Sequence, residues 1–111
     1  MNCRDFILSQ DGAHSCRIVL PCFEADKPSE KPEFACRMNR FYSAAADAAY
    51  RYAQTLFDGT ERRIGYFCSY EVRETEEATE VLLRFTLRRT GQAASRRELL
   101  HRWKDGVLLS R

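Results

Sequence analysis

Five aromatic or imidazole side chains could together recognise a ligand. They are Tyr52, Tyr66, Tyr70, His101 and Trp103. Each combines an apolar ring with a polar tip, and this combination suits a ligand held between a helix and a sheet. The same side chains also suit a core whose polar tips reach its margin. The sequence therefore predicts a candidate ligand-binding cleft near His101, with ordinary core packing as the other interpretation.

Histidine and cysteine near the N-terminus raise the question of a zinc site, because thiolates and imidazoles are ligands that zinc prefers. His14 and Cys16 lie two positions apart, and a hairpin would bring Cys3 and Cys22 near them. The spacing matches no standard zinc motif, and buried cysteines commonly act as small apolar residues. We therefore expect no bound metal, and nothing in the sequence indicates another cofactor.

A catalytic thiol needs a base within hydrogen-bond reach. A symmetric hairpin after residue 90 would set Phe85 opposite His101, which leaves Cys68 and His101 on one face but two strands apart. The sequence also lacks a glycine-rich phosphate loop and a Ser-His-Asp order. We therefore expect a non-catalytic module that binds a protein or a small molecule. The alternative is a small enzyme or small-molecule-binding protein with a cleft near His101.

Basic residues gather in the last third of the chain. They are Arg84, Arg88, Arg89, Arg96, Arg97, Arg102 and Lys104. Sheets that read RNA place aromatic residues among the basic ones, and here that face offers only Phe67. Glu71, Glu80 and Glu98 share the face and would neutralise part of its charge. We therefore expect a solvated, charge-paired outer face rather than a nucleic-acid interface.

Length and composition fit one folded domain over residues 1–111. Hydrophobic residues make up 44% and charged residues 31%, as in ordinary globular proteins. The net charge of +2 provides no global field toward nucleic acid or anionic lipid. The longest apolar run, at 18–23, is too short for a membrane span. The odd number of five cysteines suggests reduced thiols, so we expect a cytoplasmic protein without membrane partners.

The first half of the chain predicts a hairpin followed by a helix. Residues 6–9 and 15–23 flank Asp11-Gly12, which favours a tight turn. After a segment rich in proline and charge, Pro32 can begin a helix and Asp58-Gly59 can end it near Phe57. An apolar stripe would run along this helix through Phe34, Met38, Phe41, Ala45, Ala48, Tyr52 and Leu56.

Apolar residues alternate from Ile64 onward, which is the period of a strand. A turn centred on residues 76 and 77 predicts four apolar pairs: Val72 with Val81, Tyr70 with Leu83, Cys68 with Phe85, and Tyr66 with Leu87. The same register sets Arg73 opposite Glu80 on the other face. This agreement between the two faces supports the register.

The remaining residues predict two more strands. A turn near Gly91 leads into residues 95–104, and Asp105-Gly106 turns the chain into a short strand at 107–109. The predicted class is α+β, with one long amphipathic helix packed on an antiparallel sheet in the order ββ-α-ββββ. The last strand would end the sheet, so it could pair with a second copy in a homodimer.

Three short motifs carry a resemblance to a known family. They are Ile-Val-Leu-Pro at 18–21, Met-Asn at 38–39, and Trp-Lys-Asp-Gly-Val-Leu at 103–108. Together they resemble a bacterial domain family of unknown function that includes the sensor regions of lysozyme-responsive anti-sigma factors. This resemblance implies a helix-on-sheet fold and a binding role rather than catalysis.

Overall fold

Two strands precede a 26-residue helix and four follow it in the computed structural model, which describes residues 1–28 and 30–110. The elements are β1 (Asn2–Gln10), β2 (Ser15–Glu24), α1 (Pro32–Phe57), β3 (Ile64–Glu74), β4 (Thr79–Arg89), β5 (Ser95–Lys104) and β6 (Val107–Ser110). The predicted α+β class and the order ββ-α-ββββ are confirmed. No helix in these ranges combines the length and the hydrophobicity that crossing a bilayer requires.

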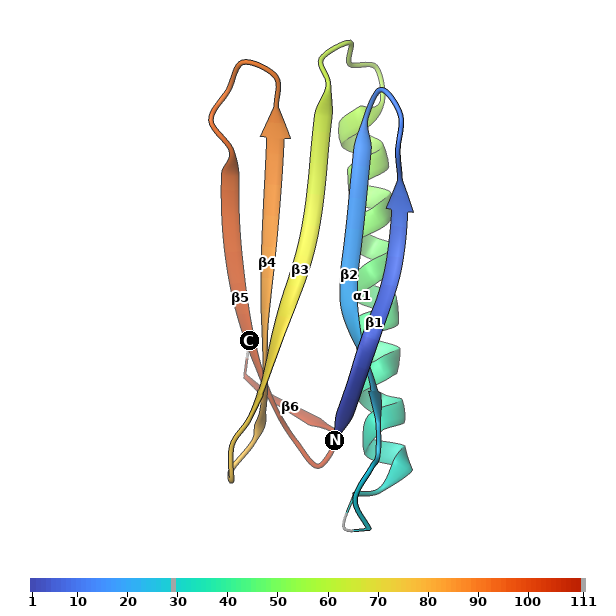
Figure 1. Cartoon of the computed structure of the whole chain (residues 1–111), viewed down its shortest axis with the longest axis vertical. Coiled ribbons are helices and arrows are strands. Elements are labelled where there is room, and N and C mark those ends of the chain that lie inside the picture. Colours follow the sequence, from blue (N-terminus) through green and yellow to red (C-terminus); the bar gives the residue numbers. More distant parts are fainter. Residues whose placement is uncertain (29, 111) are drawn as a thin grey trace.

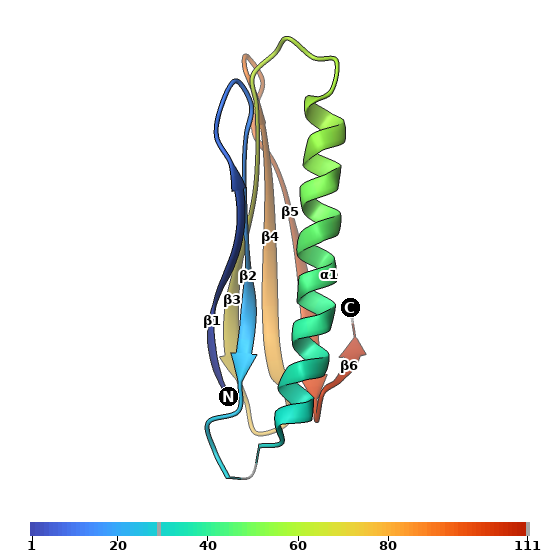
Figure 2. The ribbon, with the colours of Figure 1, turned by 90° about the vertical axis from the view of Figure 1, so that its right-hand side faces the viewer.

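The strands lie side by side in chain order, and α1 covers one face of the sheet (Figures 1 and 2). All neighbouring strands are antiparallel except β2 and β3, which pair in parallel over residues 15–18 and 65–68. The parallel pair follows from the connection, because α1 returns the chain to the end of the sheet where β2 began. The sheet is therefore mostly antiparallel rather than wholly so.

The hairpin of β3 and β4 has the predicted register. Val72 lies opposite Val81, and Cys68 lies opposite Phe85. On the outer face, Arg73 Nε donates to Glu80 Oε1 at 2.9 Å. Arg84 on the same face lies 2.8 Å from Glu71 and 3.5 Å from Glu98. These pairs show that the outer face is charge-paired there, as the sequence predicted.

The hairpin of β4 and β5 differs from its predicted register. Phe85 lies opposite Arg97, whereas His101 lies opposite Val81. The reason is a tighter turn, centred on Gly91, in which the Gln92 N–H donates to the Arg89 carbonyl at 3.1 Å. The prediction that Phe85 faces His101 was therefore wrong, and Arg97 takes that place on the apolar face of the sheet.

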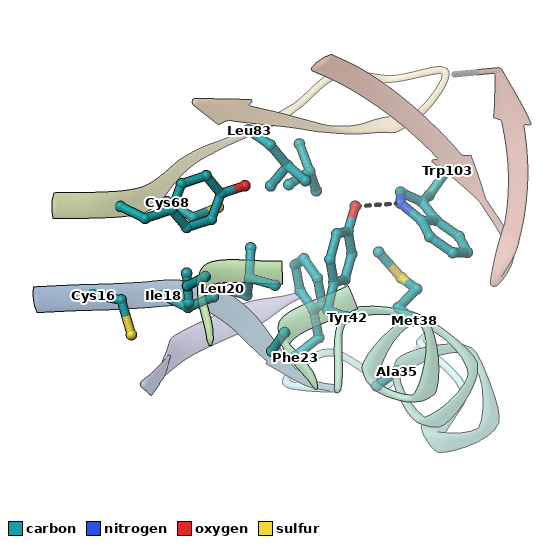
Figure 3. Close-up of a cluster of buried hydrophobic side chains, with 14 of the residues drawn as sticks. Cys16, Ile18, Leu20, Phe23, Ala35, Met38, Tyr42, Cys68, Leu83 and Trp103 are labelled. Carbon is teal, nitrogen blue, oxygen red and sulfur yellow. Dashed lines mark hydrogen bonds between the residues drawn. The ribbon is translucent and has the colours of Figure 1, made fainter. Parts of the chain in front are cut away.

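The buried face of α1 is turned by about one position from the predicted stripe. The buried residues are Ala35, Met38, Tyr42, Ala46, Ala53 and Phe57. Of the predicted stripe, Phe41 is only half-buried and Tyr52 is 51% exposed. The helix packs mainly on β2, whose Ile18, Leu20 and Phe23 form the core with Met38 and Tyr42 (Figure 3). Because the contact with β2 lies to one side of the sheet, it rotates the helix and turns Tyr52 outward.

Three carboxylates surround the N-terminal ammonium of Met1. Its nitrogen lies 2.6 Å from Glu30, 2.9 Å from Glu74 and 3.2 Å from Asp26. Burial alone lowers the pKa of this ammonium, but the three hydrogen bonds raise it more, so that its pKa rises from 8.0 to about 10. The charged group thus ties the start of β1 to the loop before α1 and to the end of β3.

We expect the stability of the chain that begins at Met1 to fall as the pH rises through about 10. The folded state holds this proton more tightly than the unfolded state, so the contribution is complete below pH 8.0 and is lost above the folded pKa. The expected loss is about 1 kcal/mol, because water screens the partly exposed Glu74. Urea unfolding between pH 7.5 and pH 10.5 measures it.

The N-terminally acetylated chain is the control for this pH dependence. Acetylation removes the charge, so the acetylated chain should be less stable at pH 7.5 and should lose less stability on going to pH 10.5. Cysteines and tyrosines titrate in both forms, so their effects cancel in the comparison. The same pH dependence in both forms would show that the ammonium contributes nothing.

Candidate functional site

A groove of about 530 Å³ lies between the second half of α1 and the strands β3, β4 and β5. The helix contributes three alanines and Tyr52 to one wall. The sheet contributes Tyr66, Phe85 and Leu87 to the floor, and the start of β5 forms the rim with Ser95, Arg96 and Arg97. The groove therefore combines an apolar interior with a basic rim.

Small side chains on α1 keep this groove open. Ala45, Ala48 and Ala49 line it, and alanine favours a helix without filling the space beside it. Wall and floor meet in an aromatic contact, in which the rings of Tyr52 and Tyr66 lie 5.5 Å apart in an edge-to-face arrangement. The ring of Phe85 continues the floor at 6.3 Å from that of Tyr66. Such a surface suits an apolar or aromatic group of a ligand.

Arg97 brings a positive charge to the apolar face of the sheet. Its place opposite Phe85 puts it on the same face as that ring. Elsewhere on the sheet Arg73 and Arg84 are held by carboxylates, whereas no ion pair or hydrogen bond engages the Arg97 guanidinium within residues 1–28 and 30–110. The rim of the groove thus offers an unpaired cation to an anionic group.

Tyr66 in the groove and Cys68, two residues further along β3, both have raised pKa values. Burial, followed by the nearby Cys68 and Tyr52, raises the pKa of Tyr66 to about 12, against an opposing effect of Arg97. Burial also raises the pKa of the Cys68 thiol to about 12. Both groups stay protonated at neutral pH, and a protonated thiol is a weak nucleophile. The Tyr66 hydroxyl remains available as a neutral hydrogen-bonding group.

The structure separates the five side chains that the sequence singled out. Tyr52 and Tyr66 lie together in the groove. His101 and Trp103 lie beside Tyr42 in the core, and each is 5% exposed. Tyr42 Oη accepts a hydrogen bond from Trp103 Nε1 at 2.8 Å (Figure 3) and lies 3.0 Å from His101 Nδ1.

Tyr70 lies away from both groups. Its hydroxyl donates to Asp5 Oδ1 at 2.6 Å and lies 3.8 Å from Cys3 Sγ. Burial first, and then these two neighbours, raise the pKa of Tyr70. Tyr70 therefore links β3 to β1. It does so beyond residue 68, where β3 no longer pairs with β2.

The residues considered for zinc have other roles. His14 stacks on Phe57 with ring centroids 5.0 Å apart, and its Nδ1 accepts the Ile64 N–H at 3.2 Å. Cys16 is buried in the core, and Cys3 is exposed on the edge strand. The described ranges contain no group of three or more histidine, cysteine or acidic residues that could hold a metal ion.

Sequence reasoning missed Arg97 as a residue of the groove, although the alternation contained the signal. Leu99, His101 and Trp103 point to the apolar face, and a step of two back from Leu99 reaches Arg97. An arginine at a position where the alternation expects an apolar residue is the signal that marks Arg97. The groove itself had no comparable signal, because it depends on where α1 lies over the sheet.

Together these features define an α+β protein in which one long helix crosses a mostly antiparallel sheet beside an apolar groove. No family model and no curated protein matches the sequence. A crystal structure of a DUF3298 family protein from Pseudomonas aeruginosa PAO1 is similar, with a TM-score of 0.66 and 13% sequence identity. The match covers 98% of this chain and 55% of that one, so this chain spans about half of its length. At this identity the likeness shows the fold alone.

Proposed function

We propose that this protein is a non-catalytic binding module whose ligand places an apolar group in the groove and a negative charge beside Arg97. One observation carries the proposal: an aromatic groove of about 530 Å³ is bordered by a guanidinium without a partner in the described residues. Binding pockets typically combine an apolar lining with a few polar groups that orient the ligand. Here Arg97 supplies the orienting charge.

The energetics of the groove favour an amphiphilic anion. Covering the exposed faces of Tyr52, Phe85 and Leu87 removes apolar surface from water, which stabilises a complex by about 25 cal/mol per Å². A carboxylate or sulfonate beside Arg97 adds a charge-assisted hydrogen bond in surroundings that are less polar than water. The two contributions lie side by side, so one ligand can make both.

The chemistry of the groove supports binding rather than turnover. The raised pKa values keep Tyr66 and Cys68 protonated, and neither histidine is among the lining residues of the groove. The resemblance to sensor regions points in the same direction, because a sensor region binds its signal without converting it. We therefore infer that this chain binds its ligand without converting it.

We expect Ala48→Glu to weaken the binding of an apolar anion by about tenfold. The probe is 1-anilinonaphthalene-8-sulfonate, which joins aromatic rings to one negative charge. A glutamate at position 48 would extend into the groove that Ala48 lines and would repel the sulfonate. Isothermal titration calorimetry measures the dissociation constant for each variant.

The control is Ser43→Glu. Ser43 is also an exposed residue of α1, but it lies about 140° around the helix from Ala48 and borders a separate, open depression. The substitution introduces the same carboxylate away from the groove, so the control should bind the probe within about twofold of the unaltered chain. An equal loss in both variants would contradict the assignment of binding to the groove.

A further inference from the structure

The first part of β5 is an open edge of the sheet. Strand β6 pairs with β5 only over residues 102–104 (Figure 1). Among the described residues, no strand pairs with 95–101 on the side away from β4. Alternate N–H and C=O groups of such an edge point outward and are free to pair with another strand.

This open edge borders the groove. Ser95, Arg96 and Arg97 belong both to the edge of β5 and to the rim of the groove. The opposite edge, β1, contributes no residue to the lining of this groove. The β5 edge therefore places free backbone groups next to an unfilled apolar groove.

We propose that an extended acidic segment of another protein adds to the sheet as a strand along residues 95–101. This inference rests on the proposed binding function and names the class of its ligand. Strand addition obtains affinity from backbone hydrogen bonds and specificity from alternate side chains. The groove and its two arginines supply that specificity.

The side chains of β5 define what the added strand must carry on the groove side. Residues directly opposite each other on neighbouring strands share a face. Ser95 is small, so a large apolar side chain opposite it reaches over it toward Leu87. The residue opposite Arg97 is acidic, and the residue opposite the half-buried Leu99 is apolar.

The outer face adds a second requirement. Arg96 favours an acidic residue opposite it, whereas Glu98 is already 3.5 Å from Arg84 and requires no cation. The segment therefore follows the pattern apolar, acidic, acidic, polar, apolar, in either chain direction. This pattern carries two negative charges, one for Arg97 on the groove side and one for Arg96 on the outer face.

Charge also favours an acidic strand over a second copy of this chain as the partner of the β5 edge. A symmetric antiparallel pairing of two β5 edges that keeps both grooves on one face must centre on a residue. Centres at Arg96, Arg97 or Glu98 set that charged residue opposite its own copy, which is destabilising. A centre at Leu99 avoids this repulsion, but it pairs only residues 97–101 and sets Arg97 opposite His101, which offers no negative charge. An acidic strand from another protein meets no such repulsion.

The first test uses synthetic peptides with the core phenylalanine, glutamate, glutamate, threonine and valine, in that order and reversed. Two further forms of the tighter-binding peptide carry N-methyl groups on the odd or on the even core residues. In an added strand only one of these sets donates hydrogen bonds to β5. We expect one form to bind about tenfold or more weakly and the other to bind nearly as well as the parent peptide.

The second test reverses the charge on the rim. Arg97→Glu should weaken binding of the glutamate peptide by about tenfold, and a peptide with lysine in place of glutamate should bind this variant better than it binds the unaltered chain. Arg88→Glu on the outer face of β4 is the control with the same change in charge. Both arginines are exposed, so thermal unfolding should show that both variants remain folded.

The outcomes distinguish the two proposals. Strand addition is overturned if the two N-methylated forms bind equally, or if neither the forward nor the reversed peptide binds. Ligand binding in the groove is tested separately by Ala48→Glu and is not affected by that result. If the sulfonate probe is insensitive to Ala48→Glu, the binding function itself fails. Selective loss with one N-methylation pattern together with the charge exchange at Arg97 supports the inference.

Discussion

Tyr42→Phe is expected to lower the free energy of unfolding by about 2–4 kcal/mol. The substitution keeps the ring, which packs 5.8 Å from the rings of both His101 and Trp103, and removes only the hydroxyl. Trp103 Nε1 then loses its acceptor, and His101 Nδ1 loses a partner at 3.0 Å. A buried polar group left without a partner, as Trp103 Nε1 would be, costs about 1–3 kcal/mol, and the lost hydrogen bond to His101 adds about 1 kcal/mol.

The hydroxyl of Tyr42 can serve both neighbours at once. Burial raises its pKa, although the hydrogen bond from Trp103 acts in the other direction. The hydroxyl therefore keeps its proton at neutral pH, so it can donate that proton to His101 Nδ1 while accepting from Trp103. This arrangement places two polar side chains of β5 in the core without an unpaired charge.

Tyr66→Phe is the matched control for this prediction. Tyr66 is 8% exposed, and its hydroxyl makes no hydrogen bond within the described part of the chain. Its loss should change the free energy of unfolding by less than about 0.5 kcal/mol. Urea unfolding followed by tryptophan fluorescence measures both variants. A similar loss in the two would show that hydrogen bonding by Tyr42 adds no stability.

Gly106→Ala is expected to cost about 2–4 kcal/mol of stability. Gly106 has a φ of 73° and follows Asp105, whose φ of 52° is also positive, as the two-residue turn between β5 and β6 requires. A Cβ atom at Gly106 would lie 2.9 Å from Cα of Phe34. The Phe34 N–H is bonded to the Lys31 carbonyl at the start of α1, so this backbone resists moving away.

Gly91→Ala separates backbone strain from steric contact. Gly91 has a similar φ of 79°, but no atom lies within 4 Å of the position its Cβ would take. Its substitution should cost only about 1 kcal/mol, the penalty of the left-handed conformation. Thermal and urea unfolding of the two variants give the difference. Equal costs would mean that the contact with Phe34 is relieved without loss.

Local signals in the sequence were sufficient for the elements. Pro32 marked the start of α1 because its ring fixes φ and its missing N–H needs no partner there. Asp58-Gly59 marked its end because glycine readily takes the positive φ that stops a helix, 69° at Gly59. The register of β3 and β4 could be predicted because both faces of the hairpin require the same alignment. Apolar residues pair on one face, and Arg73 pairs with Glu80 on the other. Such constraints act between residues close in the chain, so they do not depend on the rest of the fold.

The sequence did not determine which face of α1 packs against the sheet. Apolar and alanine residues are so frequent in this helix that stripes through Phe41 and through Tyr42 both satisfy helical spacing. The choice between them depends on which strand the helix contacts, and that strand is β2. The hydrogen bonds of the Asn39 side chain to the backbone of Phe23, at 2.7 and 3.0 Å, help to hold this position.

The candidate cleft shows the same division between sequence and structure. The sequence by itself determined that Tyr66, His101 and Trp103 would lie on the apolar face of the sheet, because the alternation along a strand fixes which face each residue takes. Only the tertiary structure decided that Tyr42 joins His101 and Trp103 in the core, while Tyr52 and Tyr66 border a groove beside Arg97. The position of α1 over β2 and the tight turn at Gly91 bring those residues together across long stretches of chain, and no local pattern encodes such distances.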